Sequence, residues 1–104
     1  MSAAAAVLLT AAQAASAMAG SVIAGPGSAA INGISIDTRT LRTGEVYLAI
    51  IGERVDGHRF VREALQAGAA GLVVSDPSSV PPSLDPAVVV VRVDETTIAL
   101  QRLA

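Results

Sequence analysis

Ile36-Asp37-Thr38-Arg39 and Gly52-Glu53-Arg54-Val55-Asp56-Gly57-His58 are two polar loops on either side of the strand-like run 46–50. The second loop leads into a helix-like run, 59–67, and then into a second apolar run, 71–74. Strand, helix and strand at this spacing predict two parallel strands joined by a crossover. Loops that follow a strand and precede a helix are where α/β proteins bind anionic ligands, which makes these two loops the candidate site.

Reading outward from the two loops, the alternation of apolar and polar residues predicts a strand near 34–37, and runs that are apolar on both faces predict strands near 46–51, 71–75 and 88–91. Helices are predicted over 57–67 and 95–104, the second capped by Asp94, with Ile98 and Leu103 facing inward. At 104 residues the chain fits one domain. The predicted fold is α/β, a small mixed or parallel sheet with flanking helices.

The Ala-rich amino terminus, residues 1–22, superficially resembles a signal peptide. A signal peptide needs a positive start, however, and no basic residue precedes Arg39. The longest strongly apolar run, 3–9, is also too short to span a bilayer. Thr10 and Gln13 fit a capping box, and Gly20 fits the residue just past a helix end. We therefore expect a short helix here, with no membrane insertion.

Composition excludes several kinds of chemistry. The net charge of −2 provides no basic surface for nucleic acid, and the absence of Cys removes thiolate ligands and nucleophiles. Lys is also absent, which excludes a P-loop and a Schiff base. His58 is the only His, so a transition-metal site is not expected. We predict no catalytic residues, no metal and no cofactor within these residues.

Binding is better supported than catalysis. A helix that starts near Gly57 offers unpaired amides and a partial positive charge, with Arg54 and His58 as further donors. These groups suit a phosphate or diphosphate, although Asp56, as the cap, would occupy some amides and repel an anion. The alternative for Asp37 and Arg39 is a local ion pair that shapes the turn. Thr38 could likewise be a turn hydroxyl that bonds its own backbone.

Four runs, in order 34–39, 44–49, 52–60 and 64–70, closely resemble the amino-terminal domain of Mur ligases. The Gly-Glu-Arg before Asp-Gly-His is most similar to the MurF-type branch, which adds D-alanyl-D-alanine to the peptidoglycan precursor. Departures from the family pattern include Val55, where an aromatic residue is common, so we expect a weaker stacking contact on uracil at this position. The MurE-type branch and a freestanding nucleotide-binding module are the alternatives.

The resemblance implies that residues 1–104 form the domain that binds the UDP-N-acetylmuramoyl-peptide substrate of a cytoplasmic ligase. In that family ATP and Mg²⁺ belong to a central domain with a P-loop, so we expect the chain to stop before that domain and to be inactive alone. The substrate-binding residues implied in this way are Thr38, Arg39, Glu53, Arg54, Val55 and His58.

Overall fold

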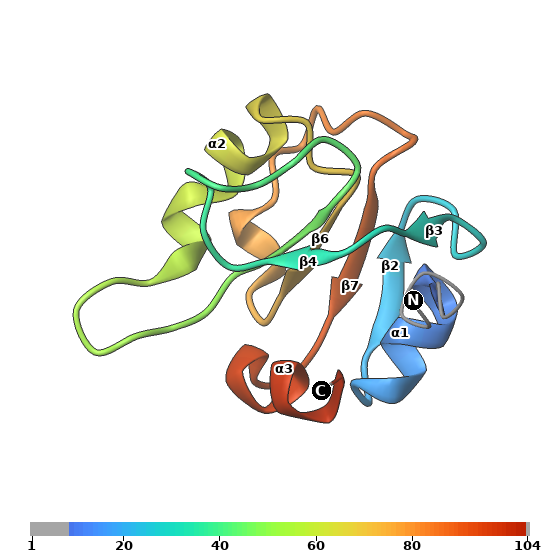
Figure 1. The fold of residues 1–104 in the computed structure, drawn as a ribbon, viewed down its shortest axis with the longest axis horizontal. Helices are drawn as coiled ribbons and strands as arrows, with labels where there is room; N and C mark the ends of the chain where they lie inside the picture. The colour runs from blue at the N-terminus through green and yellow to red at the C-terminus, as the bar shows by residue number, and fades with distance from the viewer. Residues whose placement is uncertain (1–8, 104) are drawn as a thin grey trace, which may run out of the picture.

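The computed structural model describes residues 9–103, with side chains as far as residue 102, so most of the apolar run 3–9 lies outside the described residues. A five-stranded sheet, in the order β2-β7-β6-β5-β4, forms the centre of the molecule (Figure 1). The strands are β2 (Ser21–Ala24), β4 (Ile34–Ser35), β5 (Val46–Leu48), β6 (Gly71–Val74) and β7 (Val89–Arg92). β2 is antiparallel to β7, while β4 to β7 are mutually parallel. The predicted mixed α/β class is confirmed.

The predicted crossover joins β5 and β6. These strands are parallel neighbours, with Val46 opposite Gly71 and Tyr47 opposite Leu72. Between them the chain forms a 3-10 turn, η2 (Gly57–Phe60), which continues as the helix α2 (Val61–Gln66). Val61 and Ala64 are buried, whereas Arg62 and Glu63 are exposed, so the helix buries one face against the sheet. The prediction of neighbouring parallel strands is confirmed.

Helices cover both faces of the sheet. Val46 and Leu48 of β5 pack with the helices α1 (Ala11–Ala17) and α3 (Thr96–Leu103), while Tyr47 packs on the α2 side. All residues of β5 and β6 are buried, which explains why both runs are apolar at every position. Fully burying one Val or Leu side chain contributes roughly 1.5–3 kcal/mol, so these two strands form much of the core.

The amino-terminal helix begins as predicted but ends differently. Thr10 Oγ1 accepts from the Gln13 amide at 3.1 Å, and Gln13 Oε1 accepts from the Thr10 amide at 2.9 Å, which confirms the capping box. At the other end Ala19, at φ 56°, and not Gly20, takes the left-handed conformation. A Cβ on Gly20 would lie 2.5 Å from the Arg92 carbonyl oxygen, so this glycine permits close approach of the chain to β7.

Four short elements escaped the sequence analysis. β2 is an edge strand whose residues alternate between exposed and half-buried. Its four residues come soon after the Ala-rich helix, and an alternation this short does not predict a strand. The strands β1 (Leu9–Thr10) and β3 (Ala30–Ile31) form a separate antiparallel pair. The 3-10 turn η3 (Pro77–Ser79) lies in the segment that joins β6 to β7.

Several observed bounds differ from the predicted ones; β4, for example, ends at Ser35 instead of residue 37, and α3 begins at Thr96 instead of residue 95. β5 ends at Leu48 instead of continuing to Ile51, whose side chain is 55% exposed. In α3 the buried residues Thr96 and Ala99 share the stripe that faces the core. Ile98 lies off that stripe, and 42% of its surface is exposed. The inward orientation predicted for Ile98 is therefore wrong. The side chain of Leu103 lies outside the described part of the chain.

Candidate functional site

The candidate site lies at the carboxyl ends of the parallel strands β4 and β5. The loop after β4 carries Asp37, Thr38 and Arg39, and the loop after β5 carries residues 52–56. Both loops extend from the same side of the sheet, on the left in Figure 1, whereas α1 lies on the right. Because the carboxyl ends of parallel strands meet at one edge, the sheet brings together two segments that are separate in sequence.

A hollow of about 510 Å³ opens beside the loop after β4. Its wall is shared between that loop, strand β5 and the helix that follows. The lining residues are Ile36, Asp37, Thr38, Arg39, Tyr47, Phe60 and Glu63. The hollow therefore combines two aromatic side chains with the Thr38 hydroxyl and charged groups of both signs, a combination that suits an amphipathic ligand.

Asp37 and Arg39 form the local ion pair that the sequence analysis kept as an alternative. Arg39 Nη2 donates to Asp37 Oδ2 at 2.8 Å, and the Arg39 amide donates to Asp37 Oδ1 at 2.9 Å. The side-chain hydrogen bond from Arg39, followed by that backbone hydrogen bond, lowers the pKa of Asp37 to about 2. The side-chain hydrogen bond to Asp37 in turn raises the pKa of Arg39. The Arg39 side chain nevertheless remains 87% exposed, so its guanidinium is open to solvent.

The loop after β5 is a short hairpin that projects from the sheet. The Gly52 amide donates to the Val55 carbonyl at 2.8 Å, and Ile51 forms a bridge with Asp56. Glu53, Arg54 and Val55 are exposed at its tip. Among the described hydrogen bonds, none uses the backbone N–H groups of residues 53–55, so these amides are available to a ligand. The hairpin does not line the hollow beside Thr38, so the two features occupy neighbouring parts of one edge.

The amides at the start of η2 are already occupied. The Gly57 amide donates to the Ile50 carbonyl at 2.7 Å, and the His58 amide donates to Asp56 Oδ1 at 2.9 Å. The Arg59 amide donates to the Asp56 carbonyl at 3.1 Å. The expectation of free amides at this helix start is therefore wrong, because Asp56 caps the turn. Bonds from His58 lower the pKa of Asp56, whose charge also disfavours an anion at this point.

His58 lies inside the molecule instead of at the surface. Its residue exposure is 9%, and both ring nitrogens have protein partners. Ser75 Oγ lies 3.4 Å from Nε2, so Asp56, His58 and Ser75 superficially resemble a catalytic triad. The Ser75 amide, however, donates to Nε2 at 3.0 Å, which uses the lone pair that a general base needs. The arrangement does not support nucleophilic catalysis.

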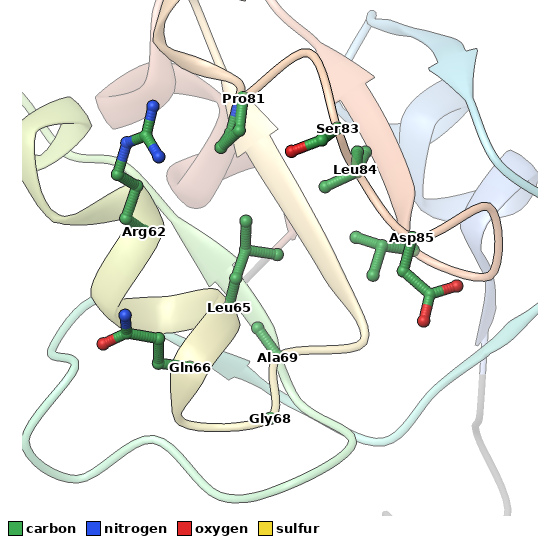
Figure 2. Close-up of a pocket in the computed structure, with 10 residues that line it drawn as sticks. Arg62, Leu65, Gln66, Gly68, Ala69, Pro81, Ser83, Leu84 and Asp85 are labelled. Carbon is green, nitrogen blue, oxygen red and sulfur yellow. The ribbon is translucent and has the colours of Figure 1, made fainter.

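A second hollow, of about 450 Å³, lies between α2 and the proline-rich loop before β7 (Figure 2). Leu65 and Ala69 lie near its centre in Figure 2, with Arg62 on the α2 side and Ser83 on the loop side. Gly68 and Val88, which also line it, precede β6 and β7, so it lies toward the amino ends of the strands. Since ligands of open α/β sheets bind at the carboxyl ends, we place the candidate site at the other edge.

Within the described residues, no helix is both long and apolar enough to span a bilayer. The same residues include no group of three or more His, Cys, Asp or Glu side chains placed to hold a metal ion.

Comparison with known proteins gives consistent results. Residues 30–104 match the family model described as "Mur ligase family, catalytic domain". Over 74 residues the chain is 40% identical to the UDP-N-acetylmuramoyl-tripeptide–D-alanyl-D-alanine ligase of Synechocystis sp., covering 71% of this chain and 16% of that protein. It is 38% identical over 74 residues to the UDP-N-acetylmuramoyl-L-alanyl-D-glutamate–2,6-diaminopimelate ligase of Gloeobacter violaceus, covering 71% of this chain and 14% of that protein.

A solved structure of MurF from Acinetobacter baumannii superimposes with a TM-score of 0.76 at 29% identity. The superposition covers 93% of this chain and 20% of that one. The chain thus spans less than a quarter of the length of each of these relatives.

Proposed function

This chain belongs to the Mur ligase family, and we propose that its 104 residues form the domain that holds the UDP end of a UDP-N-acetylmuramoyl-peptide substrate. The whole ligase would be of the MurF type, joining D-alanyl-D-alanine to the peptide in peptidoglycan precursor synthesis in the cytoplasm. The relative from Synechocystis sp. carries that activity in its name.

The observation that carries the proposal is the pairing of an amphipathic hollow with an exposed hairpin at one edge of the sheet. The hollow beside Thr38 has aromatic walls, from Tyr47 and Phe60, of a size that suits a nucleoside. The hairpin offers amides and a guanidinium, which are the groups that bind phosphates. Base and sugar would occupy the hollow, and the diphosphate would extend toward the hairpin.

Each proposed residue has a specific role. Thr38 supplies a hydroxyl at the hollow, and Arg39, braced by Asp37, presents a positive charge at its rim. Arg54 supplies a second positive charge at the hairpin tip, and Glu53 and Val55 contribute their backbone N–H groups. His58, which sequence reasoning placed among the ligand contacts, would act through the position it gives the hairpin.

ATP and Mg²⁺ are assigned to other domains of the ligase. A P-loop needs a Lys, and this chain has none. The described residues also lack a cluster of side chains that could hold a metal. Amide-bond formation through ATP would therefore need the central and carboxyl-terminal domains as partners, and nucleic acid is not proposed as a ligand.

Titration of the ¹⁵N-labelled chain with UDP tests the proposal. We expect the amide signals of residues 36–39 and 52–56 to move, with a dissociation constant in the millimolar range, equivalent to about 4 kcal/mol, because only part of the ligase is present. Arg54→Ala should weaken binding at least about tenfold, because a charge-assisted contact contributes roughly 1.5–3 kcal/mol.

Arg62→Ala is the matched control, since Arg62 is an exposed arginine that lines the other hollow. Its affinity for UDP should equal that of the unmodified chain. Shifts that avoid both loops, or equal losses in the two variants, would contradict the assignment of the site.

The MurE-type activity is the second candidate, because identity to a diaminopimelate-adding relative is nearly as high, 38% against 40% over the same length. An assay of the complete ligase would separate the two. Consumption of D-alanyl-D-alanine supports the MurF type, and consumption of 2,6-diaminopimelate supports the MurE type. A protein that binds UDP and consumes neither D-alanyl-D-alanine nor 2,6-diaminopimelate would instead be a freestanding binding module.

A further inference from the structure

His58 connects the hairpin to the strand beside it. Its Nδ1 lies 2.6 Å from Asp56 Oδ1, at the base of the hairpin. On the other side of the ring, Nε2 lies 3.0 Å from the Ser75 amide and 3.3 Å from the Asp76 amide, just after β6. The imidazole therefore links the base of the hairpin, which precedes η2, to the segment that follows β6.

These contacts define the position of the ring proton. Backbone N–H groups can only donate, so Nε2, which receives two of them, must carry a lone pair and no proton. The proton of the neutral ring then lies on Nδ1 and is donated to the Asp56 carboxylate, which acts here only as an acceptor. Asp56 Oδ1 also accepts from the His58 amide at 2.9 Å, so Asp56 holds both the backbone and the ring of His58.

Further contacts hold the backbone next to the ring in place. The Tyr47 hydroxyl donates to the Gly57 carbonyl at 2.8 Å in a buried contact, and a Cβ on Gly57 would lie 2.8 Å from the backbone nitrogen and oxygen of Ile50. The base of the hairpin is thus held by the Ile50 backbone, by the Tyr47 hydroxyl and by the His58 ring. Its tip, with Arg54, has no such contact among the described residues.

We infer that His58 is a positioning residue for the UDP site: as the Nδ1-protonated tautomer it holds the hairpin 50–57 against the end of β6, and it does not touch the ligand. This inference rests on the proposed function for the identity of the ligand. The bridge itself is a property of the chain without ligand.

Two NMR measurements on the unliganded 104-residue chain test the bridge. The ¹⁵N shifts of the His58 ring should show a protonated Nδ1 and an unprotonated Nε2 at neutral pH. A through-hydrogen-bond coupling should connect the Ser75 amide nitrogen to Nε2. A ring protonated on Nε2, or a missing coupling to a well-resolved Ser75 amide, would overturn the inference without any reference to UDP.

Two substitutions of His58 each keep the contacts on one side of the ring and remove those on the other. In His58→Gln the side-chain oxygen can reach the place of Nε2 and accept from the Ser75 amide. In His58→Asn the side-chain N–H can reach the place of Nδ1 and donate to Asp56, but the Ser75 and Asp76 amides lose their acceptor. We expect UDP affinity to fall roughly tenfold in His58→Asn and by less than about threefold in His58→Gln, because only His58→Asn leaves the part-buried Ser75 amide without its acceptor.

The ring signals separate positioning from direct contact. On UDP addition the amides of residues 53–55 should move while the His58 ring nitrogens remain where they are. Ring shifts as large as that of the Arg54 amide would mean that His58 touches the ligand, and the inference would fail. Thr10→Ala, which weakens the distant helix α1, is the control for general destabilisation and should leave UDP affinity unchanged.

If UDP does not bind at all, the proposed function fails. The role of His58 in holding the hairpin is then tested by the mobility of the hairpin backbone. Heteronuclear relaxation at residues 53–55 should then show a more mobile hairpin in His58→Asn than in His58→Gln. Equal order in both variants would contradict the role of His58.

Discussion

Ala19 has the backbone conformation least suited to its side chain. Its φ of 56° lies in the left-handed region, where a Cβ approaches the following carbonyl and costs roughly 1–2 kcal/mol. The position is held by two hydrogen bonds that close α1: the Ala19 amide donates to the Ser16 carbonyl at 3.1 Å, and the Gly20 amide donates to the Ala15 carbonyl at 2.7 Å. Helices usually place Gly at this position.

Ala19→Gly should therefore stabilise the chain by about 1 kcal/mol, which raises Tm by roughly 4–8 °C in a domain of this size. Thermal unfolding followed by circular dichroism measures the change. Gly20→Ala is the companion variant and should lower Tm, because its Cβ would meet the Arg92 carbonyl oxygen at 2.5 Å. A fall in Tm for Ala19→Gly would contradict the helix end described here.

The Asp37 carboxylate gives a prediction about pH. Its folded pKa of about 2 lies below its ordinary value of 3.8, because Arg39 donates to the charged form. The ion pair therefore contributes fully above about pH 4, and its contribution is lost as the pH falls toward 2. Carboxyl-carbon NMR should show a midpoint near 2 for Asp37, and Arg39→Gln should move that midpoint toward 3.8. An unchanged midpoint in Arg39→Gln would mean that another group lowers this pKa.

At the scale of elements, the crossover from β5 to β6 is the unit that builds the candidate site. Its helical part is short, four residues of 3-10 turn and six of α-helix, so little of its stability comes from the helix itself. Burial of Val61 and Ala64 against the sheet and the hydrogen bond from Tyr47 to Gly57 hold it in place. Burial, as the largest cause, also raises the pKa of the Tyr47 hydroxyl.

Tyr47→Phe should destabilise the chain by about 1–3 kcal/mol, because the buried Gly57 carbonyl loses its donor while the ring keeps its packing. Urea unfolding gives the value from the change in midpoint. Thr97→Ala, at an exposed position of α3, is the reference and should change the free energy of unfolding by less than about 0.5 kcal/mol. Equal midpoints for the two variants would show that the Tyr47 hydroxyl is not needed.

At the scale of the whole molecule, the sheet separates two kinds of surface. Its carboxyl edge carries exposed loops with charged residues, while its faces are covered by α1 and α3 on one side and by α2 on the other (Figure 1). Because β5 and β6 are buried on both faces, we expect a ligand at the carboxyl ends of the strands, where the loops and the hollow beside Thr38 lie.

The isolated chain should not turn over ATP. Without Lys it has no P-loop, and the described residues include no cluster of side chains placed to hold the metal ion that accompanies a triphosphate. A phosphate-release assay on the purified chain should match a blank prepared from cells that lack it. ATP hydrolysis that exceeds this blank and co-purifies with the chain would contradict the assignment of ATP to the other domains.

Much of this architecture could be predicted from residues alone. The capping box at Thr10, the apolar runs around Tyr47 and Leu72, and the buried face of α2 depend on local periodicity, which a sequence displays directly. The same is true of the Asp37–Arg39 pair, whose members are two residues apart and which had been kept as one of two interpretations. The shared motifs identified the family for the same reason, because they are contiguous in the chain.

Apart from the pairing of β5 with β6, contacts between distant segments were not predictable, because periodicity does not show which segments lie side by side. Only the fold shows that β2 joins the sheet as an antiparallel edge beside β7. Only the fold brings Ser75 to the ring of His58, and this contact turns a candidate ligand donor into an internal bridge. The sequence by itself determined the class of fold and the family, and it indicated the loops of the candidate site. The tertiary structure decided which polar groups of those loops are already satisfied by the protein, since a hydrogen-bond donor used within the chain is no longer free for a ligand.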